Sequence, residues 1–319
     1  MKEFFIVSNQ LCLFLFLYVV GVISVKLKIL NQSSLDSMAK FIVNITMPLM
    51  LFVTITNGPS LEDFKNVALI LILYPLFLAI LYLISSLIVK LVKIRAEHKN
   101  LFKATFMFAN AGFIGIPLTL SLFPNTGVIY ISGCMIVDQL LLWTIGVSFT
   151  KPIEENGQRE NLFKHLKKML NPCLVAILVA VLFLVFNLKL PGFLNTYVRK
   201  VGDLTTALAL IYIGGLFCYT NIKTMIKNVE TYLIVAVKML LIPLIIYFLF
   251  GLSGLLSDPV VYDQIKAMLI ILSLPSMSSL VMLAKINKTD SDYVLGNVTL
   301  TTMFSLITVP IVTLIFNSL

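Results

Sequence analysis

Two apolar stretches, FANAGFIGIPLTL at residues 108–120 and LSLPSMSSLVML at residues 272–283, decide the fold of this chain. Each is apolar enough for a helix inside a bilayer, yet each carries helix-weakening residues near its middle. Proline removes a backbone donor and clashes with the preceding turn, and glycine and serine weaken a helix. We therefore predict that both stretches unwind at the same depth. The residues concerned are Asn110, Gly112, Gly115, Pro117, Pro275, Ser276, Ser278 and Ser279.

Unwound backbone at membrane depth must line a cavity or be buried in protein, because lipid offers no hydrogen-bond partner. The half-helices on either side of a break also present free N–H groups and a partial positive charge, which suit a carboxylate. An alternative reading is a pair of ordinary proline kinks, which membrane helices tolerate. Position, depth and small polar content agree between the two stretches, so we interpret them as a candidate binding site.

The composition around these stretches is that of an integral membrane protein. The chain has 319 residues, of which 59% are hydrophobic and 12% charged, with a mean hydropathy of +1.00. Soluble domains average about 25% charged residues. Continuous apolar runs of about 20 residues predict an all-α fold of ten transmembrane helices and exclude an alternating β-barrel pattern. The predicted spans are 4–25, 35–56, 67–89, 101–122, 128–150, 169–187, 201–220, 229–250, 265–284 and 292–316.

Lysine and arginine are unevenly distributed between the two sides of these spans. One side carries 17 of the 24, the other carries six, and Lys238 falls inside a span. The positive-inside rule predicts that both termini are extracytoplasmic, in a cytoplasmic membrane. The net charge of +9 is therefore interpreted as topological, and no nucleic-acid partner is expected.

A polar loop, KPIEENGQRENLFKHLKK at 151–168, divides the chain into a first repeat at 1–150 and a second at 169–319. The same rule places this loop in the cytoplasm. Five spans is an odd number, so related halves would have opposite orientations. We predict a 5+5 inverted repeat, which is common in secondary transporters. The two interrupted spans are the fourth of each half.

Two charged residues lie inside predicted spans, Asp138 in the fifth and Lys238 in the eighth. A charge at the bilayer centre costs at least about 2.5 kcal/mol, so intramembrane charges are usually functional. One hypothesis makes Asp138 a proton or sodium coupling site, with the neighbouring Gln139 facing the solute. Lys238 is a candidate counter-charge for an anion. A structural Asp138–Lys238 ion pair is the alternative.

Several motifs, in this order along the chain, resemble the auxin efflux carrier family, which includes plant PIN-type exporters and bacterial malate or malonate permeases. The strongest are NAGFIGIP at 110–117 and SLPSMSSLVMLAK at 273–285, followed by TLTTMFSLITVPIVTLI at 299–315. MPLMLF at 47–52 and NPCLVAIL at 171–178 match the starts of other spans. The resemblance covers the whole chain.

The resemblance implies a scaffold of spans 1, 2, 6 and 7, often the homodimer contact, and a transport domain of spans 3–5 and 8–10. Spans 4 and 9 would cross at the centre of the transport domain, which would slide like an elevator. Asn110 and Gln139 match polar substrate-site positions of the plant members. The plant members have proline where this chain has Ala109, so we expect the first break between Gly112 and Pro117 instead. Span 3 also lacks the charged pair of those members, which argues against an indole-acetate-like substrate.

The sequence thus favours a secondary transporter of a small organic anion, with a carboxylate as the leading class. A sodium-coupled symporter like the bile-acid group, and a channel or non-transporting receptor on the same scaffold, remain alternatives. An intramembrane enzyme is disfavoured, because Asp138 alone is clearly at depth and His98 and His165 lie in loops. No cofactor or metal is expected, since Cys12, Cys134, Cys173 and Cys218 share no metal-ligand spacing.

Overall fold

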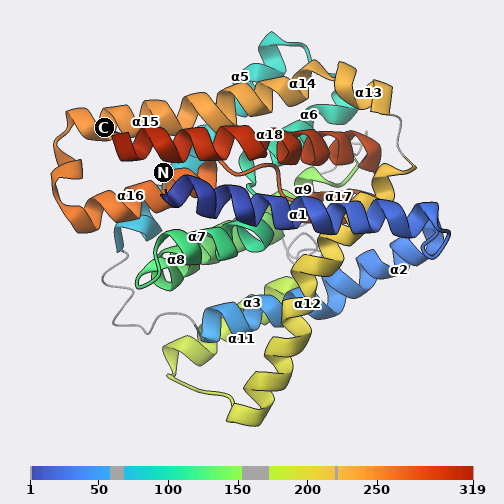
Figure 1. Ribbon diagram of the computed structural model, residues 1–319, viewed down its shortest axis with the longest axis horizontal. Helices are drawn as coiled ribbons and strands as arrows, with labels where there is room; N and C mark the ends of the chain where they lie inside the picture. The colour runs from blue at the N-terminus through green and yellow to red at the C-terminus, as the bar shows by residue number, and fades with distance from the viewer. Residues whose placement is uncertain (1, 58–67, 153–171, 220–221, 319) are drawn as a thin grey trace, which may run out of the picture.

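The computed structural model describes residues 2–57, 68–152, 172–219 and 222–318, and in these ranges the regular structure is helical apart from one isolated β-bridge. Helices pack side by side, with the start of α1 and the end of α18 at the same end of the bundle (Figure 1). The all-helical class predicted from the apolar runs is confirmed.

The described residues of the first half form α-helical, π-helical and 3₁₀-helical segments. They are α1 Lys2–Lys26, α2 Gln32–Phe41, η1 Ile42–Thr46, α3 Met47–Thr56, α5 Ala68–Leu91, η2 Ala96–His98, α6 Lys99–Met107, η3 Ala111–Gly115, α7 Ile116–Leu122, α8 Gly127–Leu141, η4 Leu142–Gly146 and α9 Val147–Phe149. Segments η1, η3 and η4 are π-helical and continue into the α-helix that follows.

The second half has the same character. Its helices are α11 Pro172–Val185, α12 Gly192–Phe217, α13 Ile222–Lys227, α14 Val229–Leu233, the π-helical η5 Ile234–Leu241, α15 Ile242–Leu252, η6 Leu255–Ser257, α16 Pro259–Leu272, α17 Ser279–Ile286 and α18 Ser291–Ser318. The predicted loop at 151–168 lies outside the described residues from position 153 onward.

Within the described residues, six helices are long and apolar enough to cross a membrane. They are Gln32–Thr56, Ala68–Leu91, Gly127–Phe149, Gly192–Phe217, Val229–Leu252 and Ser291–Phe316. Shorter apolar helices cover Leu11–Lys26 and Pro172–Val185. The expected spans at 101–122 and 265–284 are helical at both ends and interrupted in the middle.

Helix α1 packs against α12, and α12 and α11 in turn pack on α3. A Cβ added at Gly214 would lie 1.9 Å from the Tyr18 carbonyl oxygen, and one at Gly21 would lie 2.0 Å from the Ile211 carbonyl oxygen. Small residues let membrane helices approach until their backbones touch. These two glycines therefore set the α1–α12 contact.

The first interruption lies at Phe108–Asn110, between α6 and η3, and not at the glycines and proline that follow. The expectation of a break between Gly112 and Pro117 is therefore wrong. Gly112 and Gly115 lie in η3, and Pro117 lies in α7, inside the continuous helical run 111–122. The chain unwinds at Ala109 although that position is not proline, because the backbone there bonds to the second interrupted helix.

Candidate functional site

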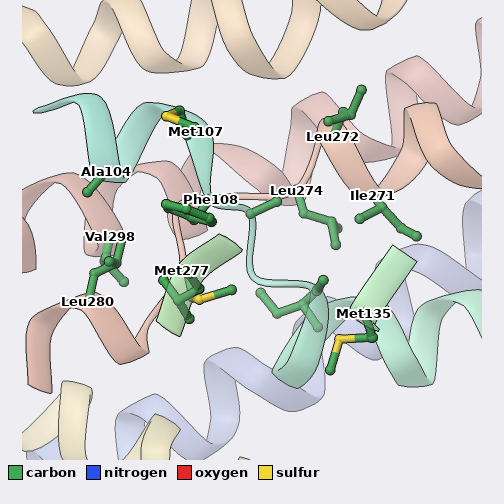
Figure 2. Packing of buried hydrophobic residues seen from close by; sticks show 14 of the residues in the cluster. Ala104, Met107, Phe108, Met135, Ile271, Leu272, Leu274, Met277, Leu280 and Val298 are labelled. Atoms are coloured by element: carbon green, nitrogen blue, oxygen red, sulfur yellow. The ribbon is translucent and has the colours of Figure 1, made fainter. Parts of the chain in front are cut away.

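The two unwound segments meet and pair with each other. The Asn110 N–H donates to the Pro275 carbonyl at 2.9 Å, and the Met277 N–H donates to the Phe108 carbonyl at 3.1 Å. Ala109 and Ser276 form an antiparallel bridge between them. Figure 2 shows the crossing from close by, with Phe108 of one segment beside Leu274 of the other among buried apolar side chains. Backbone groups freed by each break are thus satisfied by the other.

Polar side chains also form hydrogen bonds at the crossing. Asn110 donates from Nδ2 to Ser278 Oγ at 2.7 Å. Ser276 donates from Oγ to the Thr105 carbonyl at 2.8 Å, and its N–H donates to Thr301 Oγ1 at 3.1 Å. All five residues are buried.

A small cavity lies against the crossing, with about 240 Å³ of empty space including its opening. Its lining residues come from α3, α8 and the two interrupted helices; they are Met47, Met50, Asn110, Gly112, Gln139, Met277 and Ser279. The interior has room for about one water molecule. The site is therefore too small to hold an organic solute in this conformation.

Four of the residues predicted from sequence line this cavity together: Asn110, Gly112, Gln139 and Ser279. The three methionines were not predicted as site residues, although Met47 and Met50 belong to the quoted MPLMLF segment. Thioether side chains are flexible and polarisable, which suits a surface that adapts to its ligand. No charged side chain lines the cavity among the described residues.

Gln139 and Asp138 are adjacent in α8 but have different surroundings. Gln139 faces the cavity, its Oε1 accepts from Trp143 Nε1 at 3.0 Å, and its Nε2 donates to Asp138 Oδ2 at 3.3 Å. Asp138 is fully buried beside Tyr74 and interacts electrostatically with Lys238. Its second oxygen, Oδ1, has no hydrogen-bond partner among the described residues.

Lys238, in η5, is also fully buried, and its Nζ donates to the Leu274 carbonyl at 2.6 Å. That carbonyl lies just after the end of α16, where the partial negative charge of a helix favours a cation. Lys238 and Asp138 are not among the ion pairs with N···O distances up to 4.0 Å in the described residues. The direct structural ion pair considered from sequence is therefore not formed in this conformation.

The remaining predicted residues support the crossing and do not line the cavity. Pro275 supplies the carbonyl that holds Asn110, and Ser276 and Ser278 bond as described above. A Cβ at Gly115 would lie 3.1 Å from Leu274 Cδ1, so this glycine allows close packing of the two interrupted helices.

Membrane-length helices with two interrupted members that pair through their backbones beside a small cavity define an integral membrane transport protein. The chain belongs to the family described as membrane transport protein, whose model matches residues 6–313. This is the family of auxin efflux carriers and malate-type permeases, so the resemblance seen in the sequence is confirmed.

A relative from Methanocaldococcus jannaschii, described as an uncharacterized transporter, is 26% identical over 211 residues. The match covers 63% of this chain and 65% of the relative, which is less than two thirds of its length. This likeness agrees with the family and says nothing about the solute.

Proposed function

We propose that the protein is a secondary transporter that moves a small organic anion, with a carboxylate as the favoured class, across the cytoplasmic membrane. The observation that carries this proposal is the pairing of residues 108–110 with 275–277 beside the cavity. Unwound backbone in the middle of membrane helices is tolerated where it serves a binding site or is buried in protein.

Donors around the cavity support an anionic solute. The helical run 111–122 and α17 both begin at the crossing, and each contributes a residue of its first turn, Gly112 and Ser279, to the lining. Helix N-termini present free N–H groups and a partial positive charge. The side-chain amides of Asn110 and Gln139 add donors, and the buried Lys238 adds a formal positive charge close to the crossing.

The cavity has one wall from α3 and the other from α8 and the interrupted helices, which supports an elevator-type cycle. In this proposal α5–α9 and α14–α18 move together past a scaffold of α1–α3, α11 and α12, and the scaffold forms the homodimer contact. In this cycle the small cavity widens to admit the solute and opens to each side in turn. The 5+5 inverted repeat and extracytoplasmic termini belong to the same proposal.

Asp138 is the proposed site of proton or sodium coupling. A fully buried carboxyl group with one oxygen lacking a hydrogen-bond partner is costly unless it is neutralised or bound. A proton or cation that binds there during the cycle would supply what is missing. Asp138 bonds to Gln139 at 3.3 Å, and Gln139 lines the cavity. A proton or cation bound at Asp138 would therefore change the hydrogen bonding of a cavity residue.

Thermal-shift measurements on purified protein test the solute class, because a ligand that binds only the folded state raises its stability. The panel contains mono-, di- and tricarboxylates, organic cations and neutral solutes, and hits are followed by uptake into proteoliposomes. We expect a carboxylate to raise the melting temperature of the native protein and not of an Asn110→Ala variant. A response confined to cations or neutral solutes would overturn the anion assignment.

Uptake of such a hit under imposed proton or sodium gradients tests the coupling role. We expect the Asp138→Asn variant to lose gradient dependence while it still exchanges solute between equal compartments. Asp203→Asn, the same change at an exposed carboxylate of α12, is the matched control. Gradient dependence that survives in Asp138→Asn would rule out coupling through this residue.

A further inference from the structure

Asn297, in α18, joins two other helical segments by its side chain alone. Its Oδ1 accepts hydrogen bonds from Thr231 Oγ1 at 2.6 Å and from Asn228 Nδ2 at 3.3 Å. Its Nδ2 donates to Thr105 Oγ1, in α6, at 3.3 Å. The residue is fully buried; its bonds to Thr231 and Thr105 are buried, and its bond to Asn228 is partly buried. One amide thus ties the beginning of α14 to the half-helix that leads into the first break.

Thr301 lies one turn further along α18 and extends this network to the second break. Its hydroxyl donates to the Asn297 carbonyl at 2.6 Å and accepts from the Ser276 N–H at 3.1 Å. The Ser276 hydroxyl donates to the Thr105 carbonyl at 2.8 Å. Ser276 is therefore bonded to two residues that also bond to Asn297. Thr105 bonds to the Asn297 side chain, and Thr301 bonds to its backbone carbonyl.

Ser276 is the central residue of the crossing. It forms the bridge with Ala109, and its two neighbours bond to the residues on either side of Ala109. Two residues further on, Ser278 accepts from Asn110, which lines the cavity. A shift of Ser276 would therefore displace Asn110 as well.

We propose that Asn297 is a positioning residue that sets the geometry of the helix crossing, although it does not line the cavity. An amide is required because the site needs an acceptor toward α14 and a donor toward α6 in one side chain. Without this amide, its buried hydroxyl and amide partners each lose a hydrogen-bond partner. The resulting loss of free energy is larger than the net contribution of the hydrogen bond. The inference rests on the proposed function only where it treats the crossing as the solute site.

Hydrogen exchange of the native protein, measured without solute, tests this role directly. The N–H groups of Asn110, Ser276 and Met277 are the reporters, because each bonds across the crossing or to Thr301. We expect Asn297→Ala to speed exchange at these groups by roughly tenfold or more, from the loss of two buried hydrogen bonds. Peptides from α5 and α12 should be unchanged. Thr313→Val is the matched control, since the buried Thr313 hydroxyl bonds only within α18.

A second pair of variants keeps the test decisive if Asn297→Ala does not fold. Thr301→Val keeps the shape but removes the acceptor for Ser276, whereas Thr301→Ser retains the hydroxyl. We expect faster exchange in Thr301→Val and near-native exchange in Thr301→Ser. Equal exchange in these two variants, or acceleration spread evenly over α5 and α12, would overturn the positioning role.

The response to solute separates this inference from the proposed function. If a carboxylate stabilises the native protein, Asn297→Ala and Thr301→Val should need several-fold more of it for the same shift, and Thr301→Ser should not. A native protein without any carboxylate response would count against the proposed function, while the exchange result would still decide the role of Asn297.

Discussion

The side chains of Asn110 and Ser278 are joined by a 2.7 Å hydrogen bond across 168 residues of sequence, at the point where two interrupted helices cross. Asn110 also lines the cavity, so its amide serves both the crossing and the candidate site. Mutation of Ser278 can therefore show how this buried bond affects solute affinity and how it affects stability.

Replacing Ser278 by alanine removes the acceptor and leaves Asn110 free to turn toward the cavity. A neutral hydrogen bond contributes about 0.5–1.5 kcal/mol, so we expect a two- to tenfold change in solute affinity with little loss of stability. Binding isotherms of a carboxylate hit would measure the change. Ser121→Ala, on α7 outside the cavity, is the control, and equal affinities in the two variants would contradict the assignment.

Gly112 offers a way to reduce the cavity without disturbing the fold. A Cβ at this position would meet Met50 Cε at 3.7 Å and Met135 Cε at 3.8 Å, both ordinary contacts. We expect Gly112→Ala to weaken solute binding while the melting temperature stays within about 2 °C of the native value, as for a tolerated small change. Gly192→Ala, where no atom lies within 4 Å of the new Cβ, should change neither quantity.

Gly214 has the opposite role, because a side chain there would collide with backbone. Its Cβ would lie 1.9 Å from the Tyr18 oxygen, so α1 and α12 must separate in Gly214→Ala. Overpacking typically costs about 1–3 kcal/mol and sometimes more. We expect a clear fall in melting temperature or in yield of folded protein. Gly251→Ala, whose Cβ would meet Leu256 Cδ1 at 3.8 Å, is the matched control and should behave like the native chain.

Asp290, in the turn before α18, carries a pH-dependent part of the stability. A hydrogen bond from His98 Nε2 at 3.0 Å is the main cause that lowers the pKa of this carboxyl group. A lowered pKa stabilises the folded state above the unfolded value of about 4, and this contribution is lost as pH falls toward the folded-state pKa.

His98→Phe should therefore reduce the fall in melting temperature on acidification below about pH 4, because phenylalanine cannot donate this bond. It keeps a ring where His98 stacks on Tyr293 with centroids 3.9 Å apart. The melting temperature measured as a function of pH checks this. In an Asp290→Asn background, His98→Phe should leave the pH dependence of the melting temperature unchanged. An equal effect of His98→Phe in both backgrounds would contradict this explanation.

The apolar runs and the paired weak points at 108–120 and 272–283 determined an all-helical membrane protein with two interrupted helices. These features depend on local composition, since lipid admits only segments that satisfy their own backbone and proline, glycine and serine mark where a helix can fail. The motifs also predicted the family, and four of the residues singled out from the sequence, Asn110, Gly112, Gln139 and Ser279, line one cavity.

Only the tertiary structure decided where the first helix unwinds and what surrounds the site. Ala109 carries no local reason to leave a helix; it does so because residues 275–277, far away in sequence, supply backbone partners for its neighbours. For the same reason, residue spacing in the sequence could not predict that Met47 and Met50 of α3 line the cavity. Nor could it predict that Asp138 and Lys238 form no direct ion pair. Contacts between distant segments depend on how helices pack, and packing is a property of the whole fold.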